Sequence, residues 1–450
     1  MPIFARRRLQ AMLNDLVPYL EESKAKDLIS RLRNKRAEQA LPAEMEMALL
    51  WGLHRLGEME PEPKWFGTGR LPDAYSELLF PSQPTIVEIA AMLDIALSGE
   101  EDMRRVSYLL CEAANKIKRK SGKHLFFYFF EESGYEERTY YRRRKVEKDF
   151  TVTDKLLNAL ATWLKQPPHP RERLHLSDGK TEVLVEWREQ KQNQFNFFCS
   201  MPSEVHSITE NPLYTLLTEK SDQLKNPEYE GIRCVLLADA GSTLLRRLHH
   251  VDVTNRTVSG QSIIDNFLSS SKIDVVCVFS PYRPPSTILG RVNTSISWRV
   301  TPFFRPRLTL PLKGIERLTA ALPKPRFEGY QAKELHQQGL FSHSDNRWYI
   351  ASNISTGTTM TISISARALL DLLAGHITQE QFIQKTMNGG QNQFKYHLDQ
   401  GDIITAITVE HGGLDEDDDR FTIKFSRDPS VAPLVRLGGN GNHCEEKVGL

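Results

Sequence analysis

The chain has 450 residues, of which 26% are Asp, Glu, Lys or Arg, and its formal net charge is +1. This length exceeds one ordinary hydrophobic core and predicts two or three domains, and the balanced charge means that nucleic acid would have to be bound by local basic patches. No apolar run is long enough to span a membrane, no apolar segment follows the charged start, and five scattered cysteines form no Cys-x-x-Cys pair. The composition therefore predicts a cytoplasmic protein without a membrane partner, a disulfide framework or a structural zinc site.

The first part of the chain has the pattern of helices. Apolar residues recur at helical spacing in residues 4–34, which predicts a helical hairpin with a solvated basic face. A further helix is predicted over Leu41–Leu56, with Glu44 and Glu46 in its first turns, where acidic groups favour the helix dipole. Glu46 also borders the buried face of this helix, so its carboxylate could reach inward.

Two carboxylates accompany the strands that follow. Asp73 comes after Pro72 at the edge of one apolar stretch, and Glu88 lies inside the next, Thr85–Ala90, with a hairpin turn predicted at 81–84. A carboxylate in a buried strand is costly unless it is paired or holds a cation. Hard divalent cations take oxygen ligands, so two carboxylates on adjacent strands could share one Mg²⁺ or Mn²⁺ ion.

A helix over about 99–120 and the apolar strand His124–Phe130 complete this first block. The segment 134–149 then carries closely spaced arginines and lysines between tyrosines. It predicts either an exposed basic loop or edge strand, or a nucleic-acid surface, because cations neutralise phosphates and aromatic rings stack on bases. The residues that would bind nucleic acid are Arg138, Arg142, Arg143, Arg144 and Lys145.

A second α/β block is predicted over 151–285, and it offers two other candidate sites. An enzyme pocket could lie at the ends of the buried strands 232–238 and 273–280. Alternatively, Glu182 and Glu186, which share one strand face, could join an acidic cluster, or they could simply form the wet face of an edge strand. The other members of that cluster would be Glu204, His206, Lys220 and Gln223.

The composition changes at Pro281. Prolines punctuate an extended connection with a helix near 313–322, and alternating strands and short helices follow, with an acidic loop at 415–419 that we expect to be solvated. The predicted domains are therefore 1–150, 151–285 and 286–450, the last with a flexible tail. The fold class is α/β (α+β), with a mixed β-rich C-terminal domain.

The region from about 41 to 130 resembles the core of the PD-(D/E)xK nuclease superfamily, which has the restriction-endonuclease-like fold. The resemblance rests on the helix with Glu44 and Glu46, on Pro72-Asp73 followed fifteen positions later by Glu88, and on the helix and aromatic strand that come next. It implies that Asp73 and Glu88 bind Mg²⁺ or Mn²⁺ and that Glu46 assists from the helix.

The sequence departs from this family where a lysine is expected two positions after the glutamate, because Ala90 stands there. The cation could come from Lys116 or Arg105 on the next helix, or the core has lost catalysis. The resemblance implies a metal-dependent endonuclease that acts on DNA rather than RNA, in the context of bacterial anti-phage defence. The alternative is a non-catalytic nucleic-acid-binding or scaffold subunit that assembles with a partner protein or with copies of itself.

Overall fold

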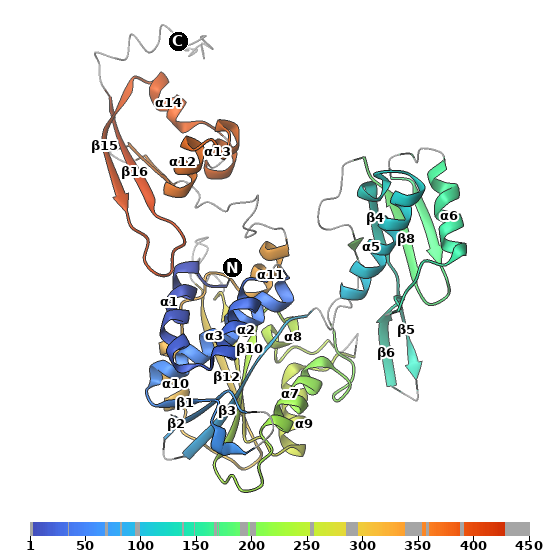
Figure 1. Ribbon diagram of the computed structural model, residues 1–450, viewed down its shortest axis with the longest axis vertical. Coiled ribbons are helices and arrows are strands. Elements are labelled where there is room, and N and C mark those ends of the chain that lie inside the picture. The colour runs from blue at the N-terminus through green and yellow to red at the C-terminus, as the bar shows by residue number, and fades with distance from the viewer. Residues whose placement is uncertain are drawn as a thin grey trace, which may run out of the picture. The chain divides into compact units, whose positions relative to one another are not determined.

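The computed structural model in Figure 1 describes residues 3–427 except 35, 68–70, 82, 95–99, 137–138, 148, 166–168, 170, 190–196, 199–203, 253–255, 285–295, 338–352, 357–359 and 388–390. The fold is a mixture of helices and several sheets, which confirms the predicted α+β class at that level. The chain forms two compact units. The first contains Met1–Phe4 and Met12–Gly339, and the second contains Ala5–Ala11 and Leu340–Leu450.

A six-stranded mixed sheet in the order β1-β2-β3-β10-β11-β12 forms the centre of the first unit. The β3–β10 and β10–β11 pairs are parallel, and the other neighbours are antiparallel. Its central strands are apolar over most of their length, as expected of strands covered on both faces. The strands are β1 (Met59–Pro61), β2 (Ala74–Phe80), β3 (Gln83–Met92), β10 (Ile232–Asp239), β11 (Val275–Tyr282) and β12 (Ser297–Phe304).

Helices pack against both faces of this sheet (Figure 1). On one face lies the long helix α3, which contacts β2, β3 and β10 and is itself contacted by α2, α10 and α11, while α7 and α9 cover the other face. The helices of the unit are α1 (Arg6–Leu16, shared with the second unit), α2 (Glu22–Leu32), α3 (Ala37–Leu56), α7 (Pro212–Gln223), α8 (Thr243–Arg246), α9 (Gly260–Ser270), α10 (Lys313–Ala321) and α11 (Gly329–Gln337).

The hydrophobic core under α7 determines which way β3 presents its side chains. Ile86 and Ala90 of β3 are buried in one cluster with Leu213 and Leu217 of α7. Side chains alternate along a strand, so Glu88, which lies between Ile86 and Ala90, faces α7 as well. The core thus places a buried carboxylate beneath this helix.

A smaller module is inserted between β3 and α7. Its four-stranded sheet has the order β7-β8-β4-β9, and the apolar face of this sheet shares one core with α5 and α6. A separate two-stranded ribbon, β5–β6, projects from it. The elements are α5 (Glu100–Ile117), β4 (Leu125–Phe129), β5 (Glu131–Glu136), β6 (Thr139–Arg144), α6 (Asp154–Lys165), β7 (Arg173–Ser177), β8 (Glu182–Trp187) and β9 (Phe197–Phe198).

The second unit is built on a four-stranded antiparallel sheet in the order β13-β14-β16-β15. Residues of α12, α13 and α14 share a hydrophobic core with this sheet. The elements are β13 (Asn353–Thr356), β14 (Met360–Ser365), α12 (Ala366–Leu373), α13 (Gln379–Thr386), α14 (Gln393–Asp399), β15 (Asp402–Glu410) and β16 (Arg420–Arg427).

The observed units differ from the predicted domains 1–150, 151–285 and 286–450. Strands on both sides of the boundary at 150 belong to one sheet, since β3 and β10 are neighbours, and β12 extends that sheet beyond 285. A parallel pair needs a long crossover, and the inserted module with α7 supplies it here. The acidic loop is not simply solvated, because Asp415 and Asp419 pair with Arg8 and Arg7 at 2.8 and 2.9 Å. The predicted flexible tail lies outside the described residues.

None of the helices in the described part of the chain is both long and apolar enough to cross a membrane.

Candidate functional site

The pairing of β2 with β3 brings Asp73 and Glu88 together. Ala74 is opposite Val87, so the preceding residue, Asp73, lies beside Glu88 on the adjacent strand. The Asp73 Oδ2 atom accepts a hydrogen bond of 2.8 Å from the backbone N–H of Ile89. Because β2 begins only at Ala74, this carboxylate takes the place of a strand partner for Ile89. Glu88 is buried, with 1% of its surface exposed.

The cation at Glu88 is Lys220, which α7 supplies. Its Nζ lies 2.7 Å from Glu88 Oε2 and also donates to Gln223 Oε1 at 3.0 Å. The position at which the family resemblance expects a lysine, Ala90, is buried in the apolar cluster beneath α7, where a charged side chain would lose its hydration. The helix packed on that same face therefore brings the ammonium to Glu88.

The sequence-based candidates for this cation, Lys116 and Arg105, both belong to α5 of the inserted module. Arg105 lies 3.9 Å from Asp149. Lys220 had been assigned to the other acidic cluster, because nothing in the local pattern showed that its helix covers β3. The apolar strand Ile232–Asp239, which follows the helix of Lys220, could have indicated this contact. If that strand pairs in parallel with β3, the helix between the two strands has to cover one face of the sheet.

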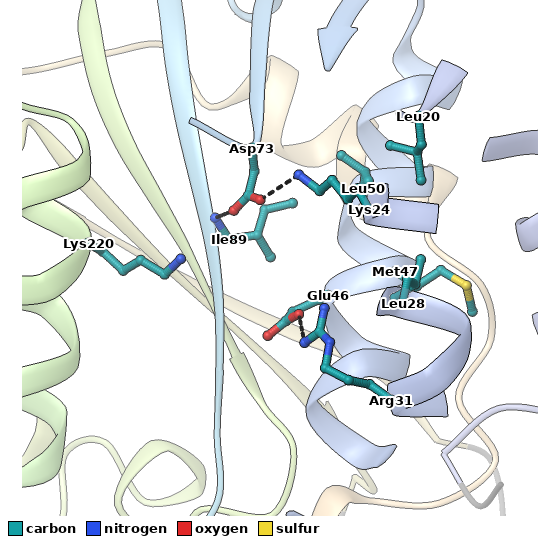
Figure 2. Close-up of a pocket in the computed structure, with 10 residues that line it drawn as sticks. All are labelled: Leu20, Lys24, Leu28, Arg31, Glu46, Met47, Leu50, Asp73, Ile89 and Lys220. Carbon is teal, nitrogen blue, oxygen red and sulfur yellow. Dashed lines mark hydrogen bonds and ion pairs between the residues drawn. The ribbon is translucent and has the colours of Figure 1, made fainter. Parts of the chain in front are cut away.

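Two further cations approach the acidic residues from α2, on the opposite side of β3 from Lys220 (Figure 2). Lys24 Nζ lies 3.0 Å from Asp73 Oδ1 and 3.2 Å from Glu62 Oε1. Arg31 Nη1 lies 2.6 Å from Oε2 of Glu46, the predicted helix acid. The prediction of a solvated basic face is wrong for Lys24 and Arg31, because helical spacing alone does not distinguish an exposed face from one turned toward carboxylates.

Glu44, the other acid of α3, has a different role. Its side chain is fully buried, and its Oε2 accepts backbone N–H bonds from Ile3 and Phe4 at 3.1 and 3.2 Å. It therefore fastens the start of the chain to α3, whereas Glu46, two residues later on the helix, faces the site.

Burial and mutual repulsion perturb the carboxyl groups of the cluster. Burial, followed by the negative charge of Asp73, raises the pKa of Glu88 to about 8, although Lys220 opposes this shift. Burial also raises the pKa of Glu46 above its ordinary value despite Arg31. For Asp73, burial alone would raise the pKa, but Lys24, Lys220 and the Ile89 N–H outweigh it and the pKa is lowered. Near neutral pH the cluster therefore holds an ionised Asp73 next to a mostly protonated Glu88.

A pocket of about 260 Å³ is lined by residues of α2, α3, β3 and α7, together with Leu20 and Asp73. Figure 2 shows the side chains that surround it, with Lys24 beside Asp73, Arg31 beside Glu46, and the ammonium of Lys220 reaching in from α7. The lining residues are Leu20, Lys24, Leu28, Arg31, Glu46, Met47, Leu50, Asp73, Ile89 and Lys220.

The donor set decides which metal site could form here. Within the described residues no group of three or more His, Cys, Asp and Glu side chains is arranged to hold a metal ion. Asp73 and Glu88 are nevertheless close enough for the charge of Asp73 to raise the pKa of Glu88. Mg²⁺ typically takes one or two protein carboxylates and completes its shell with water and substrate phosphate. An ion held by this pair would therefore occupy an open site with two protein ligands and not a closed cage.

Arg142, Arg143 and Arg144 belong to β6 of the β5–β6 ribbon and Lys145 follows it, so the segment forms a strand, as one of the predicted alternatives had it, and not a loop. Arg143 pairs with Glu132 at 2.6 Å and its guanidinium lies 4.6 Å from the centre of the Tyr141 ring, while Lys145 pairs with Glu182 at 2.7 Å. Arg144 is half-buried. Arg138 and the side chain of Arg142 lie outside the described residues. Carboxylates therefore neutralise at least two of the predicted contacts.

The members of the second acidic cluster do not all lie together, because Glu182 and Glu186 belong to β8 of the inserted module and Lys220 and Gln223 belong to α7. Glu186 is buried on β8 of the inserted module between Arg173 and Arg188, each 2.9 Å away. Glu182 lies on the same strand with Lys145 and His175, at 2.7 and 2.9 Å. These contacts match a structural role better than a catalytic one.

The end of the buried strand β10 forms a tight polar turn beside Asp94, which follows β3. Asp239 Oδ1 accepts the N–H groups of Gly241 and Ser242 at 2.9 and 2.7 Å, and both carboxylate oxygens of Asp94 accept the N–H of Thr243 at 2.9 Å. These bonds cap the start of α8, so the turn has a structural explanation.

Comparisons with known proteins assign no family to this chain, so its function has to be argued from the geometry of the site. No protein-family model matches the chain, and neither the search of curated proteins nor that of solved structures found a match.

Proposed function

We propose that this chain is a metal-dependent nuclease that hydrolyses phosphodiester bonds of nucleic acid at the cluster of Asp73, Glu88 and Lys220. The observation that carries the proposal is the contact of one cation, Lys220, with a buried carboxylate whose neighbour on the adjacent strand is a second carboxylate. A divalent cation, a carboxylate pair and an ammonium group are the components that phosphodiester hydrolysis requires.

The order of elements around the cluster supports the resemblance to the restriction-endonuclease-like core. A helix with an inward acid, three strands, a second helix and a parallel strand follow one another as α3, β1, β2, β3, α7 and β10, with the module 100–198 inserted before α7. In this arrangement Lys220 takes over the role that the missing lysine at Ala90 would have had.

Asp73 and Glu88 would hold the metal, which when bound polarises the phosphate and lowers the pKa of the attacking water. Lys220 lies where its ammonium can offset the negative charge that develops on the phosphate. Glu46 lines the pocket together with Asp73 and Lys220, and it can accept a proton or orient water, because burial holds its pKa above the ordinary value.

The second candidate function is a non-catalytic core that binds nucleic acid or a partner protein. It is favoured by the pairing of every acid in the cluster with a cation, since Lys24 holds Asp73, Arg31 holds Glu46 and Lys220 holds Glu88. A nuclease must exchange at least one of these pairs for the metal, whereas a scaffold would keep them all.

The test is cleavage of plasmid, single-stranded DNA and RNA with Mg²⁺ or Mn²⁺. We expect Asp73→Asn and Lys220→Met to lower the rate by about 100-fold or more, as loss of a charge-stabilising group does in other active sites. Lys225→Met is the matched control, because Lys225 follows the same helix and pairs with the exposed Asp222 instead of Glu88. Cutting that survives both Asp73→Asn and Lys220→Met would refute this site, and binding without any cutting by the wild type would favour the scaffold.

A further inference from the structure

The pocket beside the cluster has two chemically different halves. Lys24, Arg31, Glu46, Asp73 and Lys220 form the polar half, so three cations face two carboxylates in the lining. Behind the lining the same cations also contact Glu62, Asp27 and Glu88. The apolar half consists of the side chains of Leu20, Leu28, Met47, Leu50 and Ile89. A ligand that satisfies both halves combines an anionic group with a flat or compact apolar body.

A nucleotide has this composition, because its phosphate is anionic and its base has two apolar faces. The volume of about 260 Å³ lies just below the range typical of small-molecule sites, which begins at about 300 Å³. The pocket therefore has room for about one nucleotide, and it is too small for two stacked base pairs.

Helix α2 restricts how such a nucleotide can arrive. Lys24 near its start binds Asp73, and Arg31 near its end binds Glu46, so the helix is held to the acidic residues at two positions seven residues apart. This spacing corresponds to about 10 Å along a helix. A phosphate in the middle of a duplex has stacked and paired neighbours on both sides, and a nucleotide can leave the stack only at a cost of a few kcal/mol. An unpaired nucleotide can enter without that cost.

We propose that the substrate class of this site is single-stranded nucleic acid, of which one nucleotide enters the pocket, its phosphate toward Lys220 and Asp73 and its base against Leu28 and Met47. This inference rests on the proposed nuclease function. It goes further by assigning a wall of the pocket to the base and by excluding the interior of a duplex as substrate.

The experiment compares three substrates of one sequence with Mg²⁺: a single strand, the blunt duplex, and a duplex with a single-stranded flap. We expect the single strand and the flap to be cut at least about tenfold faster than the duplex, with cuts in the flap confined to unpaired positions. Cutting inside the duplex at a rate similar to the single strand would overturn the substrate class and leave the nuclease proposal intact. Failure to cut any of the three would overturn both.

Filling the pocket separates a substrate that uses it from one that binds elsewhere. Leu20 is half-buried in the pocket wall, whereas the preceding Tyr19 is 56% exposed and outside the lining. Leu20→Trp is expected to slow single-strand cutting by about tenfold or more, and the control Tyr19→Trp to leave it within about twofold. Unchanged cutting by a folded Leu20→Trp protein would overturn the inference.

A competition experiment needs no substitution and so does not depend on a variant that folds. A nucleoside 5′-monophosphate is expected to inhibit single-strand cutting by the wild type at least about tenfold more strongly than inorganic phosphate, since only the nucleotide fills the apolar half. Equal inhibition by the two compounds would mean that the apolar wall does not bind the base, and would overturn the inference.

Discussion

Glu88→Gln should make this protein more stable at neutral and alkaline pH, although it removes a predicted metal ligand. Glu88 is 1% exposed, and its pKa in the folded chain is about 8, compared with an ordinary value of 4.5. Between these two values the folded state binds a proton that the unfolded chain has lost, so stability falls as the pH rises. Glutamine has the shape of the protonated side chain and its oxygen can still accept the Lys220 hydrogen bond, but it never ionises.

The size of the effect follows from the shift in pKa. One unit corresponds to about 1.4 kcal/mol, so the complete shift corresponds to roughly 5 kcal/mol. At pH 5 Glu88 is already partly ionised in the unfolded chain, and at pH 8 it is half ionised in the folded chain. The free energy of unfolding of Glu88→Gln relative to the wild type should therefore rise by about 3.5 kcal/mol between these two pH values.

Urea unfolding of both proteins in the presence of EDTA, at intervals between pH 5 and pH 8, measures this difference. Glu186→Gln is a control of opposite sign, because burial of Glu186 is outweighed by Arg188 and Arg173, which lower its pKa. That carboxylate stabilises the fold above its unfolded pKa, so Glu186→Gln should be the less stable protein throughout this pH range, and its deficit should shrink only when the pH falls further, through the lowered pKa. A difference between Glu88→Gln and the wild type that does not change with pH would refute the assignment of a buried, protonated Glu88.

Two other predictions concern metal binding and packing. As the pH rises toward 8, the affinity of the wild type for Mn²⁺, measured by titration calorimetry, should increase by up to about tenfold per pH unit, because Glu88 must lose its proton before it binds the metal. Asp73→Asn should abolish this binding. An affinity that does not change with pH would contradict the two-carboxylate site. Gly314→Ala should lower the free energy of unfolding by about 3 kcal/mol or more, because the added Cβ would lie 1.9 Å from the backbone oxygen of Leu79. In the control Gly413→Ala the added Cβ meets nothing within 4 Å, so the free energy of unfolding should change by less than about 0.5 kcal/mol in either direction. Equal stability of the two variants in a thermal melt would show that α10 does not pack on β2 this closely.

Most of the local structure could be predicted from periodicity. Helices at the start, the strand that contains Glu88, the buried strands near 232–238 and 273–280 and the helix near 313–322 all occur with boundaries close to those expected. The repeat of apolar residues every 2 positions in a strand and every 3.6 positions in a helix can be read from neighbouring residues, so these elements depend little on the rest of the chain. The pairing of Asp73 with Glu88 also follows from a local hairpin.

The cations of the candidate site could not be predicted in this way. Lys220 reaches Glu88 only because β3 and β10, with about 140 residues between them, pair in parallel and bring α7 onto that face of the sheet. Parallel pairing is set by the packing of whole elements, and a module inserted in the crossover hides it from any local pattern. Lys24 and Arg31 have the spacing of an ordinary solvated helix face, and only the packing of α2 on α3 turns them toward carboxylates. The amino-acid sequence by itself thus determined the helices, the strands and the acidic pair, and the tertiary structure decided which charges surround that pair, because electrostatic contacts depend on distances between segments that lie far apart in the chain.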